Sequence, residues 1–439
     1  MHQSLLLNAV NIMTTGDETQ QSVQLLVLLL VITLAVALIS RLLRLPYTLV
    51  LVVIGLIIGF SPLLPNLRLN PDVVLFLFLP ALLFEGAWNV NMKLLTAEWL
   101  PVFLLAVPGL LLSVLVVATL LHFGLGLSWL LVLLLGAMIS PTDPIAVLTL
   151  LHQLGLSDRL RTIVEGESLF NDGVGAAIFI LVLGFLLASL GMTEAAHESS
   201  FWTVGLEAFW LMLGGLALGL GAGWIVARLI RFVDDHLIEI TVTASVAYGV
   251  YLLAVILHTS GLLAVVGAGL VLGSYGRQTG MSERTQQAAH DVWEFIGYLA
   301  NSLLFLLLGV QIGESNLVQP LVGIGIGLTL AGVITSRAVM IYALLPLHNA
   351  FARWIGRKKI SILSSLVPRP HPLPSRWRPI LLFSGLRGAL SIALVLSLPT
   401  ALPERGLLEG IVYGVVLVTL LGQGIGLRVL LPRWKRGEI

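Results

Sequence analysis

The sequence contains no cysteine, and charged residues make up only 11% of its 439 residues. The absence of cysteine excludes a disulfide framework, a zinc site with cysteine ligands and a thiol nucleophile. Soluble domains carry about 25% charged residues, so this chain has too little ionic surface for a soluble globule of its size. The formal net charge of +1 argues against a nucleic acid as its main partner.

Motifs of nucleotide and hydrolase sites are also missing. There is no G-x-x-x-x-G-K-[ST] loop, so we expect no nucleotide to bind. Neither a G-x-S-x-G nor an H-E-x-x-H motif occurs. The nine histidines lie near the ends of apolar runs or outside them, where none is placed for a metal cage. These absences predict a protein that is not an enzyme and needs no cofactor.

Apolar residues, in contrast, make up 57% of the chain, and its mean hydropathy is +1.00. A membrane-spanning helix needs about 20 mostly apolar residues. Such segments occur at about 22–40, 47–63, 72–90, 99–121, 129–151, 167–190, 203–227, 237–257, 260–275, 293–312, 321–346, 379–398 and 407–427. We therefore predict an all-α integral membrane protein with about 13 transmembrane helices in lipid.

Basic residues predict how these helices are oriented. If the N-terminus is outside, the cytoplasmic segments hold 20 of the 24 Lys and Arg residues. Short cytoplasmic loops collect such residues, so we expect a cell (inner) membrane protein with its C-terminus inside. Residues 1–20 then form a polar outer tail and 431–439 a short cytoplasmic tail. The cytoplasmic loop 347–378 contains a Pro-rich stretch and is expected to be an extended connector, with a lipid or regulatory contact as the alternative.

The predicted span 129–151 contains a strong helix-breaking signal. Pro141 and Pro144 each remove a backbone donor, so the helix must break there. At membrane depth, a broken helix is tolerated where it lines a cavity or packs within protein. The break frees carbonyl groups, such as that of Thr142, to coordinate a cation beside the carboxylate of Asp143.

The span 167–190 begins with a group of polar residues. Ser168 and Asp172 are four positions apart and share one helix face. A hydroxyl and a carboxylate are hard-oxygen ligands, which suit an alkali cation or a proton. Asn171 lies beside this face and could donate a hydrogen bond to a broken helix without adding charge. Glu167 projects elsewhere and is expected to pair with an arginine.

A second interruption is predicted in the span 379–398, where Gly385 and Gly388 flank Arg387 and loosen the helix. Two interrupted helices in corresponding positions, spans 5 and 12, indicate an inverted-repeat secondary transporter. The predicted units are a first repeat 21–190, a linker 191–235 with one helix, and a second repeat 236–430.

A few further residues need a role. Ionisable groups inside a membrane cost at least about 2.5–3.5 kcal/mol each, which makes Glu85 and Arg337 notable. For Glu85 a cation contact and a structural hydrogen bond remain equally open. Glu239 and Glu294 lie near cytoplasmic span ends and are expected on a solvated face. Small residues recur every four positions at Gly215, Gly219 and Gly223. This spacing permits close helix contact, within the chain or between copies.

Three motifs together resemble one family. Ser140-Pro-Thr-Asp-Pro144, Glu165-Gly-Glu-Ser-Leu-Phe-Asn-Asp-Gly173 and Gly385-Leu-Arg-Gly-Ala389 are similar to motifs of NhaP-type sodium/proton antiporters. These belong to the monovalent cation/proton antiporter family, which also contains the animal sodium/proton exchangers. The resemblance extends to the segments 84–86, 293–295, 301–305 and 336–338, so it spans nearly the whole membrane domain.

The resemblance implies a homodimer of thirteen-helix protomers, each with a dimerisation part and a mobile core. It implies that Asp172 carries the cation or proton. Asp143, Ser168 and the carbonyl of Thr142 would be co-ligands, so that Na⁺ would bind at Asp143, Ser168 and Asp172. Glu85 would contact the cation through water.

By the same resemblance, the Asn171–Asp172 pair goes with electroneutral one-for-one exchange. Glu167 would pair with Arg337 first and Arg387 second. The implied function is antiport of Na⁺, or Li⁺, against H⁺ by alternating access, with both substrates competing for one buried site.

Three alternatives remain open. One is a K⁺/H⁺ antiporter of the same fold, because carboxylate and hydroxyl ligands do not fix ion size. The others are a cation channel and an intramembrane aspartyl protease, although the Gly-x-Gly-Asp motif of the latter is missing.

Overall fold

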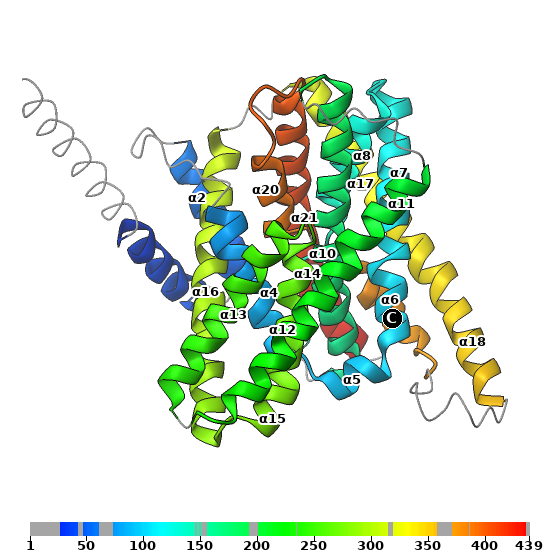
Figure 1. Ribbon diagram of the computed structural model, residues 1–439. Helices are drawn as coiled ribbons and strands as arrows, with labels where there is room; N and C mark the ends of the chain where they lie inside the picture. The colour runs from blue at the N-terminus through cyan, green and yellow to red at the C-terminus, as the bar shows by residue number, and fades with distance from the viewer. Residues whose placement is uncertain are drawn as a thin grey trace, which may run out of the picture.

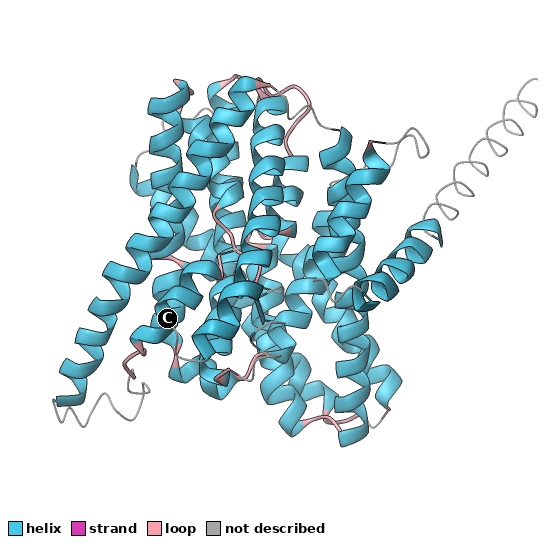
Figure 2. Cartoon of the chain, turned by 180° about the vertical axis from the view of Figure 1, so that it is seen from behind, coloured by secondary structure: helices cyan, strands magenta, loops and turns pink. Residues whose placement is uncertain are grey.

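The computed structural model describes residues 27–42, 47–60, 73–144, 147–148, 151, 156–192, 201–233, 235–314, 319–357, 371–385 and 387–435. Within these ranges the regular elements are helices and no strand occurs (Figure 1, Figure 2). The all-α fold predicted from the sequence is therefore confirmed. The predicted outer tail 1–20, residues 358–370 of the cytoplasmic loop and the last four residues of the chain lie outside the described residues.

The first half of the chain forms helices at each of its predicted spans. They are the helix Val27–Leu42, α2 (Tyr47–Gly59), the π-helical turn η1 (Val74–Phe78), α4 (Leu79–Asn89), α5 (Met92–Ala97), α6 (Trp99–Ala106), α7 (Pro108–Leu125), α8 (Trp129–Ile139) and α10 (Asp158–Ser189).

The second half continues in the same way. Its elements are α11 (Phe201–Phe209), η2 (Trp210–Gly214), α12 (Gly215–Ile230), α13 (His236–Ile256), α14 (Gly261–Val271), η3 (Leu272–Gly276), α15 (Arg277–Thr279), α16 (Glu283–Glu314), α17 (Pro320–Val339), η4 (Met340–Leu344), α18 (Leu345–Arg357), η5 (Ser375–Trp377), α19 (Arg378–Phe383), α20 (Ala389–Leu396) and α21 (Arg405–Lys435).

Among the described residues, seven helices are long and apolar enough to cross a membrane, and four shorter helices are also apolar. The outside of the bundle is covered by large apolar side chains, such as Phe123, Ile256 and Phe232, which are 77%, 72% and 88% exposed. Water does not tolerate so much apolar surface, whereas lipid does. The chain is a multi-pass membrane protein. The number of thirteen spans and the outward N-terminus stay predictions.

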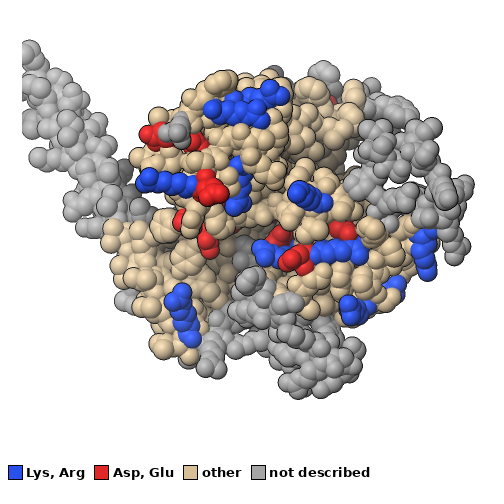
Figure 3. Space-filling view, turned by 90° about the horizontal axis from the view of Figure 1, so that it is seen from below, with Lys and Arg blue, Asp and Glu red and all other residues tan. Residues whose placement is uncertain are grey.

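Charged side chains gather at one end of the bundle, where α5 and α15 lie (Figure 1). Figure 3 views this end from below and shows Lys and Arg side chains spread over it, with Asp and Glu among them. It is the end that the distribution of basic residues assigns to the cytoplasm.

Two helices begin earlier than predicted. α10 begins at Asp158 and α16 at Glu283, about two and a half turns before the predicted spans 167–190 and 293–312. The added turns are polar and so escape a hydropathy criterion. In α10 they are supported by an ion pair between Arg161 and Glu165, whose Nε and Oε1 atoms are 2.7 Å apart.

Both predicted helix breaks are present. Residues 140–144 follow α8 without helical structure, and α19 ends at Phe383 before α20 resumes at Ala389. Figure 2 shows non-helical backbone in the middle of the helical bundle. The two breaks lie close together, because a Cβ atom added at Gly388 would overlap the side chain of Asp143. α20 also packs against α8.

The small-residue stripe of the seventh span faces a helix of the same chain. α12 packs on α14, and a Cβ atom added at the three glycines of the stripe would crowd the backbone of α14 or of the residue just before it. The contacts are Gly215 with Ser260, Gly219 with Ala264 and Gly223 with Ala268. The stripe therefore serves close packing within one protomer.

Candidate functional site

The first break lies against α10, and their polar residues meet. The hydroxyl of Ser168 donates a hydrogen bond of 2.5 Å to the carbonyl oxygen of Thr142. Asp172 follows one turn further along the same helix face, and its carboxylate interacts electrostatically with that of Asp143. The structure thus brings together Thr142, Asp143, Ser168 and Asp172, which the sequence placed in one candidate site.

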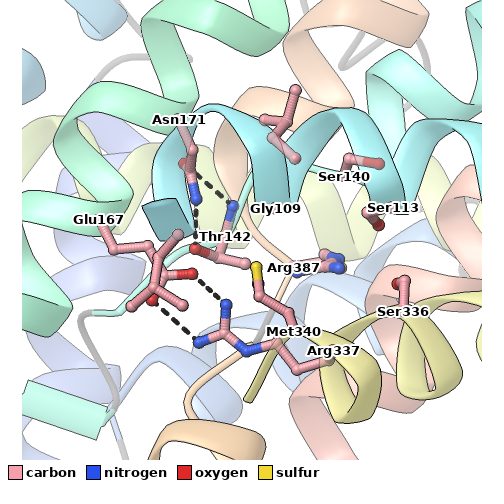
Figure 4. Close-up of a pocket in the computed structure, with 12 residues that line it drawn as sticks. Gly109, Ser113, Ser140, Thr142, Glu167, Asn171, Ser336, Arg337, Met340 and Arg387 are labelled. Atoms are coloured by element: carbon pink, nitrogen blue, oxygen red, sulfur yellow. Dashed lines mark hydrogen bonds and ion pairs between the residues drawn. The ribbon is translucent and has the colours of Figure 1, made fainter. Parts of the chain in front are cut away.

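Asn171 holds the break in place through two hydrogen bonds. Its Nδ2 atom donates to Oγ1 of Thr142 at 2.7 Å, and its Oδ1 atom accepts from the backbone N–H of Thr142 at 3.3 Å (Figure 4). Both residues are buried. A buried amide that both donates and accepts satisfies backbone and side-chain groups that the broken helix leaves open, and it adds no charge.

Glu167 and Arg337 form a buried, bidentate ion pair. Nη2 of Arg337 is 3.0 Å from Oε2 of Glu167, and Nη1 donates to Oε1. Arg337 also donates from Nε to the carbonyl oxygen of Leu381 and from Nη2 to Oγ of Ser384, each at 3.0 Å. The pair therefore connects α10 and α17 to the end of α19, where the second break begins.

The sequence predictions missed Ser384. A hydroxyl residue directly before Gly385, at a helix end, was the signal available. The sequence does not show that this hydroxyl meets Arg337, because the two residues are 47 positions apart in the chain.

Arg387 takes no part in this ion pair. Its side chain is only 2% exposed, and its hydrogen bond within the described structure runs from Nη1 to the carbonyl oxygen of Gly385 at 3.3 Å. No carboxylate of the described residues forms an ion pair with it. Arg337, the first of the two candidate arginines, is thus the one that pairs with Glu167.

Glu85 lies apart from the break. Its Oε1 atom accepts a hydrogen bond of 2.7 Å from Nδ2 of Asn89, and its side chain packs against Gly297 of α16. The structure therefore does not bring Glu85 together with the other candidate ligands.

The expectation of a solvated face was wrong for Glu239, which is only 1% exposed. α13 packs against α16 at this level, where Nε1 of Trp293 donates to Oγ1 of Thr243, one turn from Glu239. The same expectation is confirmed for Glu294, whose side chain is 69% exposed.

A small polar cavity, called here the Arg387 cavity, lies beside the break. Arg387, Ser113, Ser140 and Ser336 supply one part of its lining, and the Glu167–Arg337 pair and the Asn171–Thr142 pair supply another (Figure 4). No motif pointed to Ser113, on α7, because it stands alone in an apolar helix.

The donor set at the break fits a monovalent cation better than a transition metal. It offers carboxylate, hydroxyl and carbonyl oxygens, which are hard ligands. Within the described residues, no group of three or more His, Asp or Glu residues gathers in a way that could hold a metal ion.

A helical membrane bundle in which two broken helices meet at partly buried carboxylates has the architecture of an ion-coupled secondary transporter. The chain belongs to the sodium/hydrogen exchanger family, because the family model described as "sodium/hydrogen exchanger, transmembrane" matches residues 26–433. This confirms the resemblance seen in the motifs.

Individual relatives agree. The chain is 36% identical over 383 residues to the low-affinity Na⁺/H⁺ antiporter NhaS1 of Synechocystis sp., covering 87% of this chain and 68% of the relative. It is 35% identical over 372 residues to the Na⁺/H⁺ antiporter NhaP of Pseudomonas aeruginosa, covering 84% and 82%. The solved structure of the sodium proton antiporter MjNhaP1 from Methanocaldococcus jannaschii at pH 8 has a similar fold. Its TM-score is 0.71 at 20% identity, with 95% of this chain and 98% of that chain covered.

Proposed function

We propose that this protein exchanges Na⁺ for H⁺ across a membrane by alternating access. The observation that supports it most is the gathering of Asp172, Asp143, Ser168 and Thr142 at the first break. This arrangement occurs in a member of the sodium/hydrogen exchanger family, and relatives that share about a third of its residues bear the name Na⁺/H⁺ antiporter.

In the proposed site, Na⁺ binds between the carboxylates of Asp172 and Asp143 with two further oxygen ligands. Ser168 gives its hydrogen to the carbonyl of Thr142, so its oxygen lone pairs stay available to a cation. The Thr142 carbonyl retains a second lone pair for the same cation. Glu85 would act only as an outer contact through water, since it lies with Asn89.

Exchange then follows from competition. A carboxylate binds a cation only when it is deprotonated, so protonation expels the cation. Either occupant neutralises buried charge, whereas moving the empty anionic site past a hydrophobic gate would be too unfavourable. The core therefore moves only when loaded. Asn171 contributes no charge, which favours one Na⁺ for each H⁺.

The proposal extends to the setting of the protein. We place it in the cell (inner) membrane, with the N-terminus outside and the C-terminus inside, because basic residues cluster in the segments that would be cytoplasmic. We also expect a homodimer. K⁺ or Li⁺ in place of Na⁺ remains an alternative, because the oxygen ligands do not select by size.

The test is exchange by the full-length protein in proteoliposomes, followed with an internal pH dye after addition of Na⁺, Li⁺ or K⁺. Asp172→Asn should reduce the flux to that of empty vesicles. Asp158→Asn, an exposed residue at the start of the same helix, is the matched control and should transport normally. Normal Na⁺/H⁺ exchange by Asp172→Asn would refute the proposed cation site. A response of the unmodified protein to K⁺ alone would identify K⁺ as the transported cation.

A further inference from the structure

The Arg387 cavity contains a buried cation that forms no ion pair with any carboxylate of the described residues. Arg387 is 2% exposed, and no group of the described structure accepts a hydrogen bond from its Nε atom. Glu167 lines the same cavity, but Arg337 binds both of its carboxylate oxygens. The three side chains together carry a net charge of +1, because Arg337 and Arg387 oppose Glu167 alone. A buried, uncompensated charge is strongly unfavourable, and an arginine does not escape it by losing its proton.

Two serine hydroxyls of the cavity also lack a hydrogen-bond partner among the described residues. Ser113 and Ser140 are 6% and 4% exposed, and neither Oγ atom has a hydrogen-bond partner in the part of the chain that the structure describes. Figure 4 shows both side chains on the side of the cavity where the guanidinium of Arg387 lies. Buried polar groups normally have partners. Three buried donors around one small space, from Arg387, Ser113 and Ser140, thus lack an acceptor among the described residues.

We propose that this cavity binds a small monatomic anion, a halide such as chloride. The anion would accept hydrogen bonds from Arg387, Ser113 and Ser140 and would neutralise the charge of the arginine. A single water molecule would fill the space but leave the charge of +1 in place. The cavity is small, about 10 Å³, so it suits one monatomic ion better than a large organic anion.

The position of the cavity suggests what the anion does. Ser140 belongs to the first broken segment and Arg387 to the second. Of the proposed cation ligands, Thr142 lines the cavity, whereas Asp172, Asp143 and Ser168 do not. The halide would therefore be a resident ion that joins the two breaks, separate from the transported cation. This inference does not depend on the identity of the transported cation.

The first experiment is thermal unfolding of the full-length protein in detergent, titrated with NaCl against sodium gluconate at constant Na⁺ concentration. Gluconate is too large for the cavity. We expect Tm to rise by about 2–4 °C and to saturate with chloride, and bromide to act likewise. Equal Tm values in chloride and gluconate would overturn the proposal and leave water as the occupant.

Substitutions in the cavity then test whether the chloride-dependent rise in Tm arises there. Ser113→Ala and Ser140→Ala should raise the chloride concentration at half-saturation by at least about fivefold, and Arg387→Gln should abolish the response. Thr329→Val is the matched control, because Thr329 on α17 also has a buried hydroxyl without a partner but does not line the cavity. If Arg387→Gln does not fold, the serine variants decide. A wild-type titration in both serine variants would overturn the site.

A final arm separates this site from the cation site. Asp172→Asn should keep the chloride response, since its side chain lies outside the Arg387 cavity. Bromide-soaked crystals should show an anomalous peak beside Arg387. If the anomalous peak lies elsewhere and none lies beside Arg387, the assignment of the halide to this cavity is refuted.

Discussion

Gly388 packs so closely on Asp143 that there is no room for a Cβ atom between its backbone and the carboxyl group of Asp143. A glycine that follows Arg387 in the second broken segment thus touches the acidic residue of the first. Since a Cβ atom at position 388 would overlap both the carboxylate and the Cβ atom of Asp143, no side-chain rotation of Asp143 alone would make room. The contact between the two breaks requires glycine.

Gly388→Ala should therefore push the two breaks apart. We expect a destabilisation of about 1–3 kcal/mol and a loss of most exchange activity. Gly249→Ala on α13 is the control, because a Cβ added there meets nothing within 4 Å. Tm and Na⁺-driven proton flux measure the two effects. Wild-type flux in Gly388→Ala would show that the contact is not needed.

Breaking the Glu167–Arg337 ion pair should strongly lower the stability of the protein. Glu167→Gln leaves Arg337 buried without its counter-charge, and such changes cost about 3–5 kcal/mol. The matched control is Glu165→Gln on the same helix, whose more exposed partner is Arg161, with an expected cost of about 0.5 kcal/mol or less. Denaturation in detergent compares the two. A Glu167→Gln protein of normal stability that fails to transport would instead make Glu167 an ion ligand.

Voltage tests the role of Asn171. If one Na⁺ replaces one H⁺, no net charge crosses, so an imposed potential of 100 mV should leave the exchange rate unchanged. A single uncompensated charge would change the driving force by about 2.3 kcal/mol. Potassium-loaded proteoliposomes with valinomycin provide the potential. A transport current from the unmodified protein would contradict electroneutral exchange.

Asn171→Ala should weaken the first break, since it removes both hydrogen bonds to Thr142. We expect a loss of about 1–3 kcal/mol from the groups left unpaired. Asn171→Asp keeps an acceptor for the backbone N–H of Thr142 but adds a charge beside Asp172, so its transport should respond to voltage. Unchanged Tm in Asn171→Ala would show that the amide does not hold the break.

Falling pH should weaken the apparent Na⁺ affinity. The site binds Na⁺ only with its carboxylates deprotonated, so protons compete increasingly as pH falls through the pKa of the site. Below that pKa the Michaelis constant for Na⁺ should rise about tenfold for each pH unit, and above it the constant should level off. Initial rates across Na⁺ concentrations at several pH values measure this. A Michaelis constant independent of pH would exclude simple competition.

The packing of α12 on α14 predicts unequal effects of two neighbouring glycines. Gly219→Val should destabilise the protomer by about 1–3 kcal/mol or more, because an added Cβ overlaps the backbone of Ala264. Gly221→Val should be tolerated, since nothing lies within 4 Å of its Cβ position. Light scattering should show the same oligomeric state for both. A stable Gly219→Val protein that loses a dimer would assign the stripe to an interface between copies.

Much of the fold follows from local properties of the sequence. Apolar runs predicted where helices lie, although the first turns of α10 and α16 escaped detection because they are polar. Pro141 and Pro144 predicted the first break, since proline has no N–H to donate. The types of side chain at Thr142, Asp143, Ser168 and Asp172 predicted the chemistry of the site.

The candidate site was predicted less completely. The spacing of Ser168 and Asp172 placed them on one face, and the structure keeps them there. Glu85 could not be placed from its position in a span, because helical rotation decides whether a side chain faces the break or, as here, Asn89 and α16. Ser113 and Ser384 carried no recognisable motif, and only folding gives them their neighbours.

The sequence by itself thus determined that this chain resides in a membrane, that two of its helices break, and which side chains stand at the breaks. Those are consequences of hydropathy and of backbone chemistry within a few residues. The tertiary structure alone decided between Arg337 and Arg387 as the partner of Glu167. It also decided that Arg387 forms no ion pair with a carboxylate of the described residues, and that Gly388 meets Asp143. Such choices depend on how helices distant in the chain pack, and packing is a property of the whole molecule.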